Sequence, residues 1–392
     1  MINKQQSKQA LNWLSGSHFV NDIYTGMLNP LMPFIADKLN FSLAIATLII
    51  SISHIFSSVL QPIIGFFADN TKHRIFIFWG LIMSSIFISF SAGANTKIIF
   101  VLFVVLGSLG SSFFHPQALG LLSKLAEINN LDTAKLMGIF MGLGSLGFAL
   151  GPLISSSIAH FWGLNKIAFG CVLGIIWALL MFKFVPKINS FDNFRSKLSF
   201  CETFYNILSN RNLNILFFIA MVKTLVINSC TIILPFLWKN MGYDKLNIGI
   251  ALFGFIFAGG IASVVSPWLE NKIGTKAVLY FSLISTFPLL IIFVLTYKTT
   301  PVIAITAFIL TGAFTMLASP VIMLLAQRLA PDYRSIIAGF INGFAWGIIA
   351  ILMTGLGVIA EKIGIINLLL WISFVPVLSV VSIRYINTEI NR

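Results

Sequence analysis

Hydrophobic residues occur along this chain in long runs that short polar stretches separate. A helix needs about 20 mostly apolar residues to cross the hydrocarbon core of a bilayer. Dividing the runs at charged residues, prolines and turn residues predicts twelve membrane-spanning helices. They cover approximately residues 12–36, 42–68, 75–94, 98–123, 136–160, 167–185, 213–237, 247–268, 277–297, 301–326, 335–360 and 366–386. The pattern therefore predicts an all-α membrane protein.

The longest polar interval lies between the sixth and the seventh span, and we interpret it as a cytoplasmic linker over residues 186–212. It would separate an N-terminal six-helix half, residues 1–185, from a C-terminal half, residues 213–392. The halves also repeat. His115-Pro116 corresponds to Ser319-Pro320 at an offset of 204, and Asp69 corresponds to Glu270 at an offset of 201. These offsets indicate a duplicated unit, and duplicated halves usually place a substrate site at their interface.

Composition narrows the function classes. Hydrophobic residues make up 58% of the 392 positions and charged residues only 9%, whereas a soluble domain carries about 25% charge. A soluble enzyme, a disordered protein and a nucleic-acid-binding domain are thereby excluded. Of the 25 lysines and arginines, 17 fall on the side of the termini and 7 on the other. The positive-inside rule then predicts cytoplasmic termini in a cell membrane, which we take to be a bacterial inner membrane.

The three cysteines, Cys171, Cys201 and Cys230, lie far apart and in no metal-like spacing. The sequence therefore predicts neither a disulfide framework nor a metal site, and we expect no cofactor. It contains no metalloprotease or nucleophile–base motif, so an enzyme is not predicted. The expected partners are the lipid bilayer, a small-molecule substrate and protons, with no nucleic acid, and we expect a monomer.

The loop after the second span resembles a loop motif of the major facilitator superfamily. Gly65-Phe66-Phe67-Ala68-Asp69 is followed by Lys72 and Arg74, although Asn70 and Lys72 stand where the family carries an arginine and a glycine. A glycine permits close helix approach, and a carboxylate can cap a neighbouring helix N-terminus. The resemblance implies a twelve-helix transporter in which Gly65, Asp69, Arg74 and the echo at Glu270 act in conformational change.

The fifth span resembles the antiporter signature of the drug-exporting members of that family. Gly138, Gly147 and Gly151-Pro152 have its spacing, while Ser155-Ser156 replaces its closing glycine pair. Such glycines let helices pack closely, and a proline bends a helix. Ordinary small-residue packing is the alternative interpretation. The resemblance favours export and a gating role for Gly147, Gly151 and Pro152.

A narrower resemblance is to the fosmidomycin-resistance branch of the superfamily. It rests on His18-x-x-Asn21-Asp22-x-Tyr24-x-Gly26, on Gln61-Pro62 and on Phe114-His115-Pro116. Gln117 follows where relatives often carry an acid. The likeness covers most of the N-terminal half as motifs, and it names a branch without naming a substrate.

Two formal charges lie well inside the spans, and intramembrane charges are functional candidates. Asp22 lies on a polar stripe of its helix with His18, Asn21 and Thr25, and a stripe of this kind must face water or polar groups. His18 and Asp22 are four residues apart and can touch. We predict that Asp22, His18 and His115 couple transport to protons. A purely structural His–Asp pair is the alternative.

Lys223 lies about ten residues into the seventh span, at or beside the position equivalent to Asp22. It could bind an anionic substrate group, pair with Asp22 or be a structural charge. The other predicted substrate-binding residues are Asn21, Thr25, Gln61, Ser111 and Ser112. The overall prediction is a proton-coupled exporter (antiporter) of small, anionic or amphiphilic drugs or metabolites. A proton-coupled importer (symporter) of an organic anion or sugar, and a non-transporting receptor or scaffold, are the alternatives.

Overall fold

The structure is a computed structural model, and it describes residues 4–61, 64, 75–131, 133–185, 205, 207–330, 337 and 339–387. Every regular element within these residues is a helix. The elements of the first six spans are α1 (Lys4–Met27), η1 (Asn29–Leu31), α2 (Met32–Leu39), α3 (Leu43–His54), η2 (Ile55–Val59), α5 (Ile75–Ser91), α6 (Lys97–Ile128), α7 (Thr133–Phe161), η3 (Leu164–Gly170) and α8 (Cys171–Phe184).

The last six spans are helical in the same way. Their elements are α10 (Arg211–Asn228), η4 (Ser229–Ile233), α11 (Leu234–Asn240), α12 (Lys245–Ile273), α13 (Thr275–Thr296), α14 (Pro301–Leu329), η6 (Gly339–Phe344), α16 (Ala345–Ile363) and α17 (Ile365–Ile383). Asn210 begins α10 as an N-cap, because its side-chain oxygen accepts the N–H groups of Asn212 and Leu213. The predicted linker at 186–212 lies outside the described residues at 186–204 and 206, and its last two positions already belong to α10.

Among the described residues, nine helices are long and apolar enough to cross a membrane, and the segments Leu43–Val59 and Ile75–Ser91 are shorter apolar helices. The remaining predicted span is α1, whose first turns are polar and whose polar stripe lowers its hydropathy. These segments account for all twelve predicted spans. The fold-class prediction is therefore confirmed.

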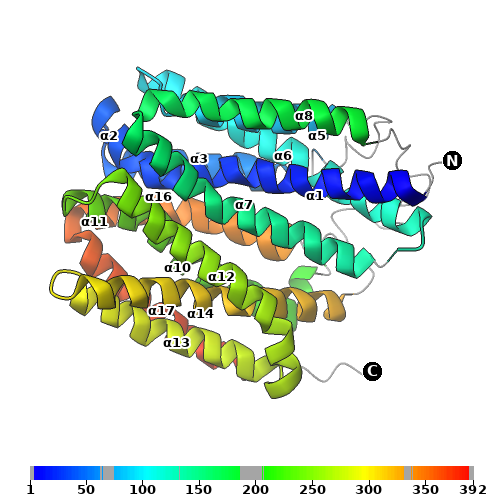
Figure 1. Ribbon diagram of the computed structural model, residues 1–392. Helices are drawn as coiled ribbons and strands as arrows, with labels where there is room; N and C mark the ends of the chain where they lie inside the picture. The colour runs from blue at the N-terminus through cyan, green and yellow to red at the C-terminus, as the bar shows by residue number, and fades with distance from the viewer. Residues whose placement is uncertain are drawn as a thin grey trace. The chain divides into compact units, whose positions relative to one another are not determined.

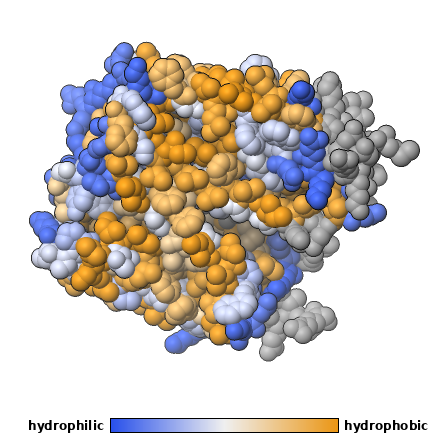
Figure 2. Space-filling view, viewed as in Figure 1, coloured by the Kyte–Doolittle hydropathy of each residue, from blue (hydrophilic) through white to orange (hydrophobic). Residues whose placement is uncertain are grey.

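Many large hydrophobic side chains remain on the surface of these helices. Figure 2 shows hydrophobic residues over the middle of the helices, with hydrophilic residues gathered toward the helix ends. Ile98, Val264, Leu295 and Leu378 are among the most exposed of them. Such an apolar belt is unfavourable in water and favourable against lipid tails, so it marks the surface that the bilayer covers.

The backbone shows the duplication directly. Gly163 and Gly364 lie 201 positions apart in the sequence, and each begins the last span of its half with a positive φ, 88° and 86°. A residue with a side chain rarely adopts that conformation, which explains the glycine at both places. The first span of each half is also interrupted at the equivalent place, by η1 and by η4.

The chain divides into two compact units. The first contains Met1–Ser42, Ile52–Phe194 and Trp238–Phe253, and the second contains Leu43–Ser51, Arg195–Leu237 and Gly254–Arg392. In the first unit α1 packs along α7, and α5 packs between α6 and α8 (Figure 1). In the second unit α13 packs against α14 and α17. The predicted boundaries at residues 185 and 213 remain predictions.

The contact between α1 and α7 is a seam of close backbone approach. A methyl group added at Gly147 would overlap the Phe19 carbonyl, and one added at Gly151 would overlap the Ile23 carbonyl. At Gly138 the same methyl group would meet nothing within 4 Å. The seam therefore fixes how α1 and α7 lie along one another, and it leaves the first turns of α7 outside the contact.

Tyr24, on α1, ties that helix to the start of α8. Its buried hydroxyl donates a hydrogen bond to the Gly170 carbonyl at 2.8 Å and accepts one from the Gly174 N–H at 2.8 Å. A buried phenol that both donates and accepts is fully satisfied. The tie thus holds the first turn of α8 against the helix that carries Asp22.

Candidate functional site

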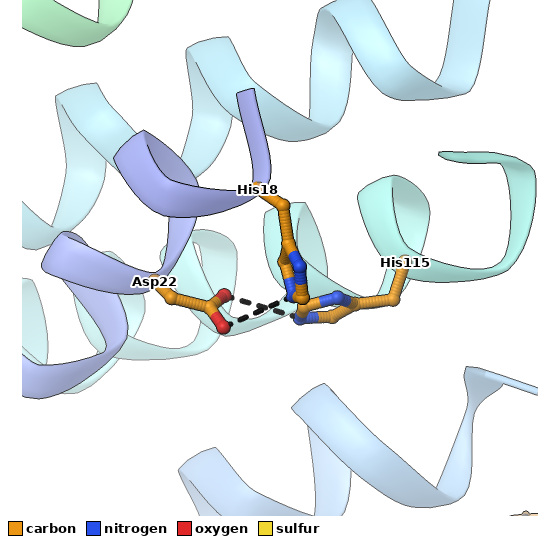
Figure 3. Close-up of side chains that lie close together, drawn as sticks. All are labelled: His18, Asp22 and His115. Carbon is orange, nitrogen blue, oxygen red and sulfur yellow. Dashed lines mark ion pairs between the residues drawn. The ribbon is translucent and has the colours of Figure 1, made fainter. Parts of the chain in front are cut away.

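Asp22 and His18 meet on one face of α1, as their spacing of four residues predicts. The Nε2 atom of His18 lies 3.1 Å from Oδ2 of Asp22 (Figure 3). The His18 side chain is enclosed, with 4% of its surface exposed, whereas 15% of the Asp22 side chain remains exposed. The two side chains therefore lie at ion-pair distance, with the imidazole buried and the carboxylate partly exposed.

His115 completes the cluster from α6. Its Nε2 atom lies 3.5 Å from Oδ1 of Asp22, and its side chain is 24% exposed. Asn21 donates a hydrogen bond from Nδ2 to the same carboxylate oxygen at 3.0 Å. The Oδ1 atom of Asn21 is buried and has no hydrogen-bond partner among the described residues.

The second nitrogen of His18 is committed to α7. Nδ1 lies 2.8 Å from the carbonyl oxygen of Phe140. A carbonyl oxygen can only accept, so Nδ1 must carry a hydrogen. If His18 were neutral and Asp22 ionised, Nε2 would carry no hydrogen, and its lone pair would face the carboxylate oxygen at 3.1 Å. Two acceptors cannot form a hydrogen bond with each other. One proton must therefore lie between the two groups, on Nε2 or on the carboxyl group.

The net charge of the cluster depends on whether the proton between His18 and Asp22 is present. With that proton, and with His115 neutral, the group of three residues has no net charge, which is the arrangement least costly to bury. Without it, the group carries one negative charge, and the contact between His18 and Asp22 becomes repulsive. The His18–Asp22 contact at 3.1 Å is thus favourable when that proton is present and unfavourable when it is absent.

The same three residues could also serve as metal ligands. His18, Asp22 and His115 each offer one ligand atom, and these atoms all lie within 4.8 Å of one another. The bond from His18 to a backbone carbonyl is of the kind that orients histidine ligands. The sequence predicts no metal site, since its three cysteines lie in no metal-like spacing. A proton and a divalent ion are thus alternative occupants of one site, and a proton alone would satisfy the contact at 3.1 Å.

Lys223 lies in the second unit and is 7% exposed. Its ammonium group donates a hydrogen bond to the Ser319 hydroxyl on α14 at 2.8 Å. Within that unit no described carboxylate lies within 4.0 Å of it. A buried ammonium with a neutral partner is incompletely compensated. This position can accept an anion.

Several predicted substrate-binding residues instead bond to the backbone. Thr25 donates to the Asp22 carbonyl at 2.8 Å, and Gln61 donates to the Ser57 carbonyl at 2.6 Å. Ser112 donates to the Phe56 carbonyl, which joins α6 to η2. Ser111 is buried on the same helix. Among the described residues of the predicted set, Asn21 is the one that hydrogen-bonds the Asp22 carboxylate.

The predicted gating residues divide into two groups. Gly65, Asp69 and Arg74 lie outside the described residues. Glu270, at the end of α12, accepts a hydrogen bond from the Thr275 hydroxyl at 2.7 Å and lies 3.5 Å from Arg328. Its carboxylate is thus placed at the N-terminus of α13. Gly151 lies in the seam with α1, as does Pro152, whose ring faces Gly26.

Sequence reasoning missed the α7 side of the cluster. Phe140 is an ordinary apolar residue in the sequence, and a backbone acceptor leaves no pattern. Gly144 was likewise overlooked, although a methyl group there would overlap the His18 ring. Ser319 carried a usable signal, because the duplication pairs it with His115 just as it pairs Lys223 with Asp22.

The comparisons with known proteins agree with this architecture. The Major Facilitator Superfamily model matches residues 14–354. The fosmidomycin resistance protein of Escherichia coli (strain K12) is 25% identical over 387 residues, which cover 95% of this chain and 91% of that protein. Multidrug resistance protein 1 of Bacillus subtilis (strain 168) is 22% identical, covering 84% of this chain and 82% of that protein.

Solved structures show the same fold. The nucleoside transporter NupG superposes with a TM-score of 0.75 at 14% identity, covering 96% of this chain and 99% of that one. A bacterial homolog of the human lysosomal transporter Spinster, in an inward-facing and occupied conformation, superposes with a TM-score of 0.75 at 13% identity and covers 97% of each chain.

Proposed function

This chain belongs to the major facilitator superfamily, and from that premise we propose that it is a proton-coupled exporter of small, anionic or amphiphilic compounds. It is a multi-pass membrane protein of a transporter family, for which a small-molecule substrate and a lipid bilayer are the partners. The coupling ion, the direction and the substrate class are the proposal. Its location in a bacterial inner membrane, with cytoplasmic termini and as a monomer, belongs to the same proposal.

The observation that carries proton coupling is the His18–Asp22–His115 cluster. Ionisable groups at membrane depth are expensive and are kept where they act. The fixed donor at His18 Nδ1 requires one removable proton in the contact with Asp22. The partial exposure of Asp22 and His115 supports exchange of that proton with water. A carrier needs these two properties together.

Lys223 supports an anionic or amphiphilic substrate. Its ammonium group is buried, and Ser319 supplies only a neutral acceptor. A carboxylate or phosphonate group would complete its hydrogen bonds and neutralise its charge. Apolar residues make up most of the spans, so the rest of a small substrate can be bound by apolar contact.

The export direction rests on two supports. The glycine run of the fifth span has the antiporter-like spacing, and Gly147 and Gly151 of that run lie in the α1–α7 seam. Relatives named for resistance to fosmidomycin and to multiple drugs cover most of the chain. Removal of a toxic compound from the cell is the simplest physical basis of such resistance.

Import by symport is a second candidate, and Lys223 favours it. Symport requires that an anion on Lys223 and the proton of the cluster favour each other's binding. That linkage moves substrate and proton together. Export requires the reverse linkage, in which the proton displaces the substrate. The alternatives differ in the sign of one measurable quantity, the dependence of substrate affinity on pH.

The test uses purified protein in proteoliposomes with fosmidomycin and a panel of small anionic drugs as test compounds. Vesicles with an acidic lumen accumulate a compound by antiport, and vesicles in an acidic bath accumulate it by symport. We expect accumulation with the acidic lumen, lost when the proton gradient is collapsed. Accumulation only with the acidic bath would establish the symporter. A wild-type protein that binds a compound but moves it independently of the proton gradient would overturn proton coupling.

A further inference from the structure

His18 is held on α7 by two features that follow one another along that helix. Nδ1 donates to the Phe140 carbonyl at 2.8 Å, and the imidazole ring stacks on the Phe140 ring with 4.0 Å between centroids. A methyl group at Gly144, one turn further on, would overlap the ring atoms Cε1, Nδ1 and Nε2 of His18. The imidazole therefore occupies the space that a side chain at position 144 would fill.

Gly144 has this effect because of helix geometry. In an α-helix the carbonyl of residue 140 accepts the N–H of residue 144, and it retains a second lone pair. Side chains one turn further on cover that lone pair. The absence of a side chain at Gly144 leaves the Phe140 carbonyl open to a donor from another helix. His18, on α1, provides that donor.

We propose that Gly144 and the Phe140 carbonyl form a clamp that positions His18 and thereby sets how tightly the cluster holds its proton. The clamp fixes the hydrogen on Nδ1, so that Nε2 always faces Asp22 and the two groups share one proton. His18 cannot turn into the other tautomer without losing the carbonyl. Gly144 is thus a positioning residue of the coupling site.

The surroundings of His18 leave few other influences on that proton. The described titratable groups that face it are Asp22 from its own helix and His115 from α6, whose ring centroid lies 5.1 Å away. The described part of α7 contributes the Phe140 carbonyl and no titratable group to this contact. Among the described residues outside α1, the Phe140 carbonyl is therefore the only hydrogen-bond acceptor for the His18 ring.

The proposal has a consequence for transport. The proton site is built from α1 and α6, but its hydrogen-bonding state depends on α7, which carries the antiporter-like glycine run. Loss of the hydrogen bond between Nδ1 and the Phe140 carbonyl would free the His18 ring and favour release of the proton. The clamp in this way links a contact made by α7 to the proton affinity of the cluster. This inference rests on the proposed function.

The test compares two glycine substitutions on the same helix. Gly144→Ala inserts a methyl group where the His18 ring lies, and Gly142→Ala inserts one where nothing lies within 4 Å. We expect Gly144→Ala to move the pH midpoint of gradient-driven fosmidomycin transport by about one unit toward lower pH, since the proton loses the support of one hydrogen bond. Gly142→Ala should leave the midpoint unchanged.

A double variant separates positioning from general loss of packing. In a His18→Asn background, Gly144→Ala should cause no further change in the pH profile, because the ring that it displaces is absent. An independent measurement is the ¹⁵N NMR spectrum of labelled imidazoles in micelles, which distinguishes the tautomers. His18 should show a protonated Nδ1 in the wild type and in Gly142→Ala, and a mixture in Gly144→Ala even if that variant transports nothing.

The outcomes are distinguishable from failure of the proposed function. If neither gradient drives transport by the wild type, proton coupling itself is rejected. If the wild type is driven by protons while Gly144→Ala and Gly142→Ala have the same pH profile and the same NMR signature, the clamp alone is rejected.

Discussion

Ser319 accepts a hydrogen bond from Lys223 at 2.8 Å, and the duplication pairs these residues with His115 and Asp22, which lie 3.5 Å apart. The same two positions of the repeated unit therefore meet in both halves. The first half carries an acid with a histidine there, and the second carries a base with a hydroxyl. The same scaffold position thus carries an acid–histidine contact in one unit and an ammonium–hydroxyl contact in the other.

The first prediction concerns that anion-accepting contact. Lys223→Ala should weaken binding of an anionic test compound by about tenfold to hundredfold, the usual effect of losing a charged hydrogen bond. Ser319→Ala should have a smaller effect, since it removes only a neutral partner. Equilibrium binding to purified protein measures both. An uncharged compound that the wild type binds is the control, and equal losses for it would show that Lys223 is structural.

Asp22→Asn tests the proton carrier. An amide cannot take up the proton shared with His18, so uphill transport driven by a pH gradient should fall to background. Downhill exchange of the same compound should remain measurable. Asp37→Asn, on α2 and outside the cluster, is the matched control. If Asp22→Asn still accumulates substrate against a gradient, the proton is carried elsewhere, with His115 as the next candidate.

The sign of the pH dependence follows from the same cluster. In an antiporter the proton and the substrate exclude one another, so affinity for the test compound should fall as the pH is lowered. Asp22→Asn should abolish this dependence. Tighter binding at low pH, lost in Lys223→Ala, would instead indicate symport. A dependence that neither substitution alters would mean that both charges are structural.

Chelation separates the two possible occupants of the cluster. We expect 1 mM EDTA (an order of magnitude above trace metal) to leave gradient-driven transport unchanged, because a proton already satisfies the His18–Asp22 contact. Metal analysis of the purified protein gives an independent measure. Loss of transport after chelation, with recovery on addition of Zn²⁺, would assign the site to a metal.

The topology can be tested with single cysteines in a variant that lacks Cys171, Cys201 and Cys230. A cysteine at Asn193, in the predicted linker, should react from the cytoplasmic face. A cysteine at Asn240, the last residue of α11, should react from the opposite face. Membrane-impermeant maleimide on intact cells and on inverted vesicles makes the comparison. Reaction of both positions from one face would contradict the twelve-span topology.

The sequence was sufficient for the helices and for half of the site. The twelve spans follow from hydropathy alone, because the bilayer imposes a length and an apolar composition on each. The contact between His18 and Asp22 follows from helix periodicity. The contact between His115 and Asp22 could not be derived from the sequence pattern, because it depends on α6 lying beside α1. The Phe114-His115-Pro116 motif supported His115 only through its resemblance to a known family.

The other contacts of the site involve backbone carbonyl groups, which every residue has. The Phe140 carbonyl is invisible in the sequence, and Gly144 looks like any other small residue of a membrane helix. Thr25, Gln61 and Ser112 were predicted to bind substrate because they are polar at membrane depth, yet their hydrogen bonds go to backbone carbonyls. A polar side chain in a span can satisfy itself locally, and hydropathy does not distinguish that case from a ligand.

The bond between Tyr24 and the start of α8 bears on the order in which the protein is made. During synthesis the first span emerges with a phenol whose two partners, the Gly170 carbonyl and the Gly174 N–H, follow about 150 residues later. Until then the hydroxyl must be satisfied by water or by the translocation machinery, since an unpaired phenol in lipid is costly. The first span can therefore make this contact only after the sixth span has been translated.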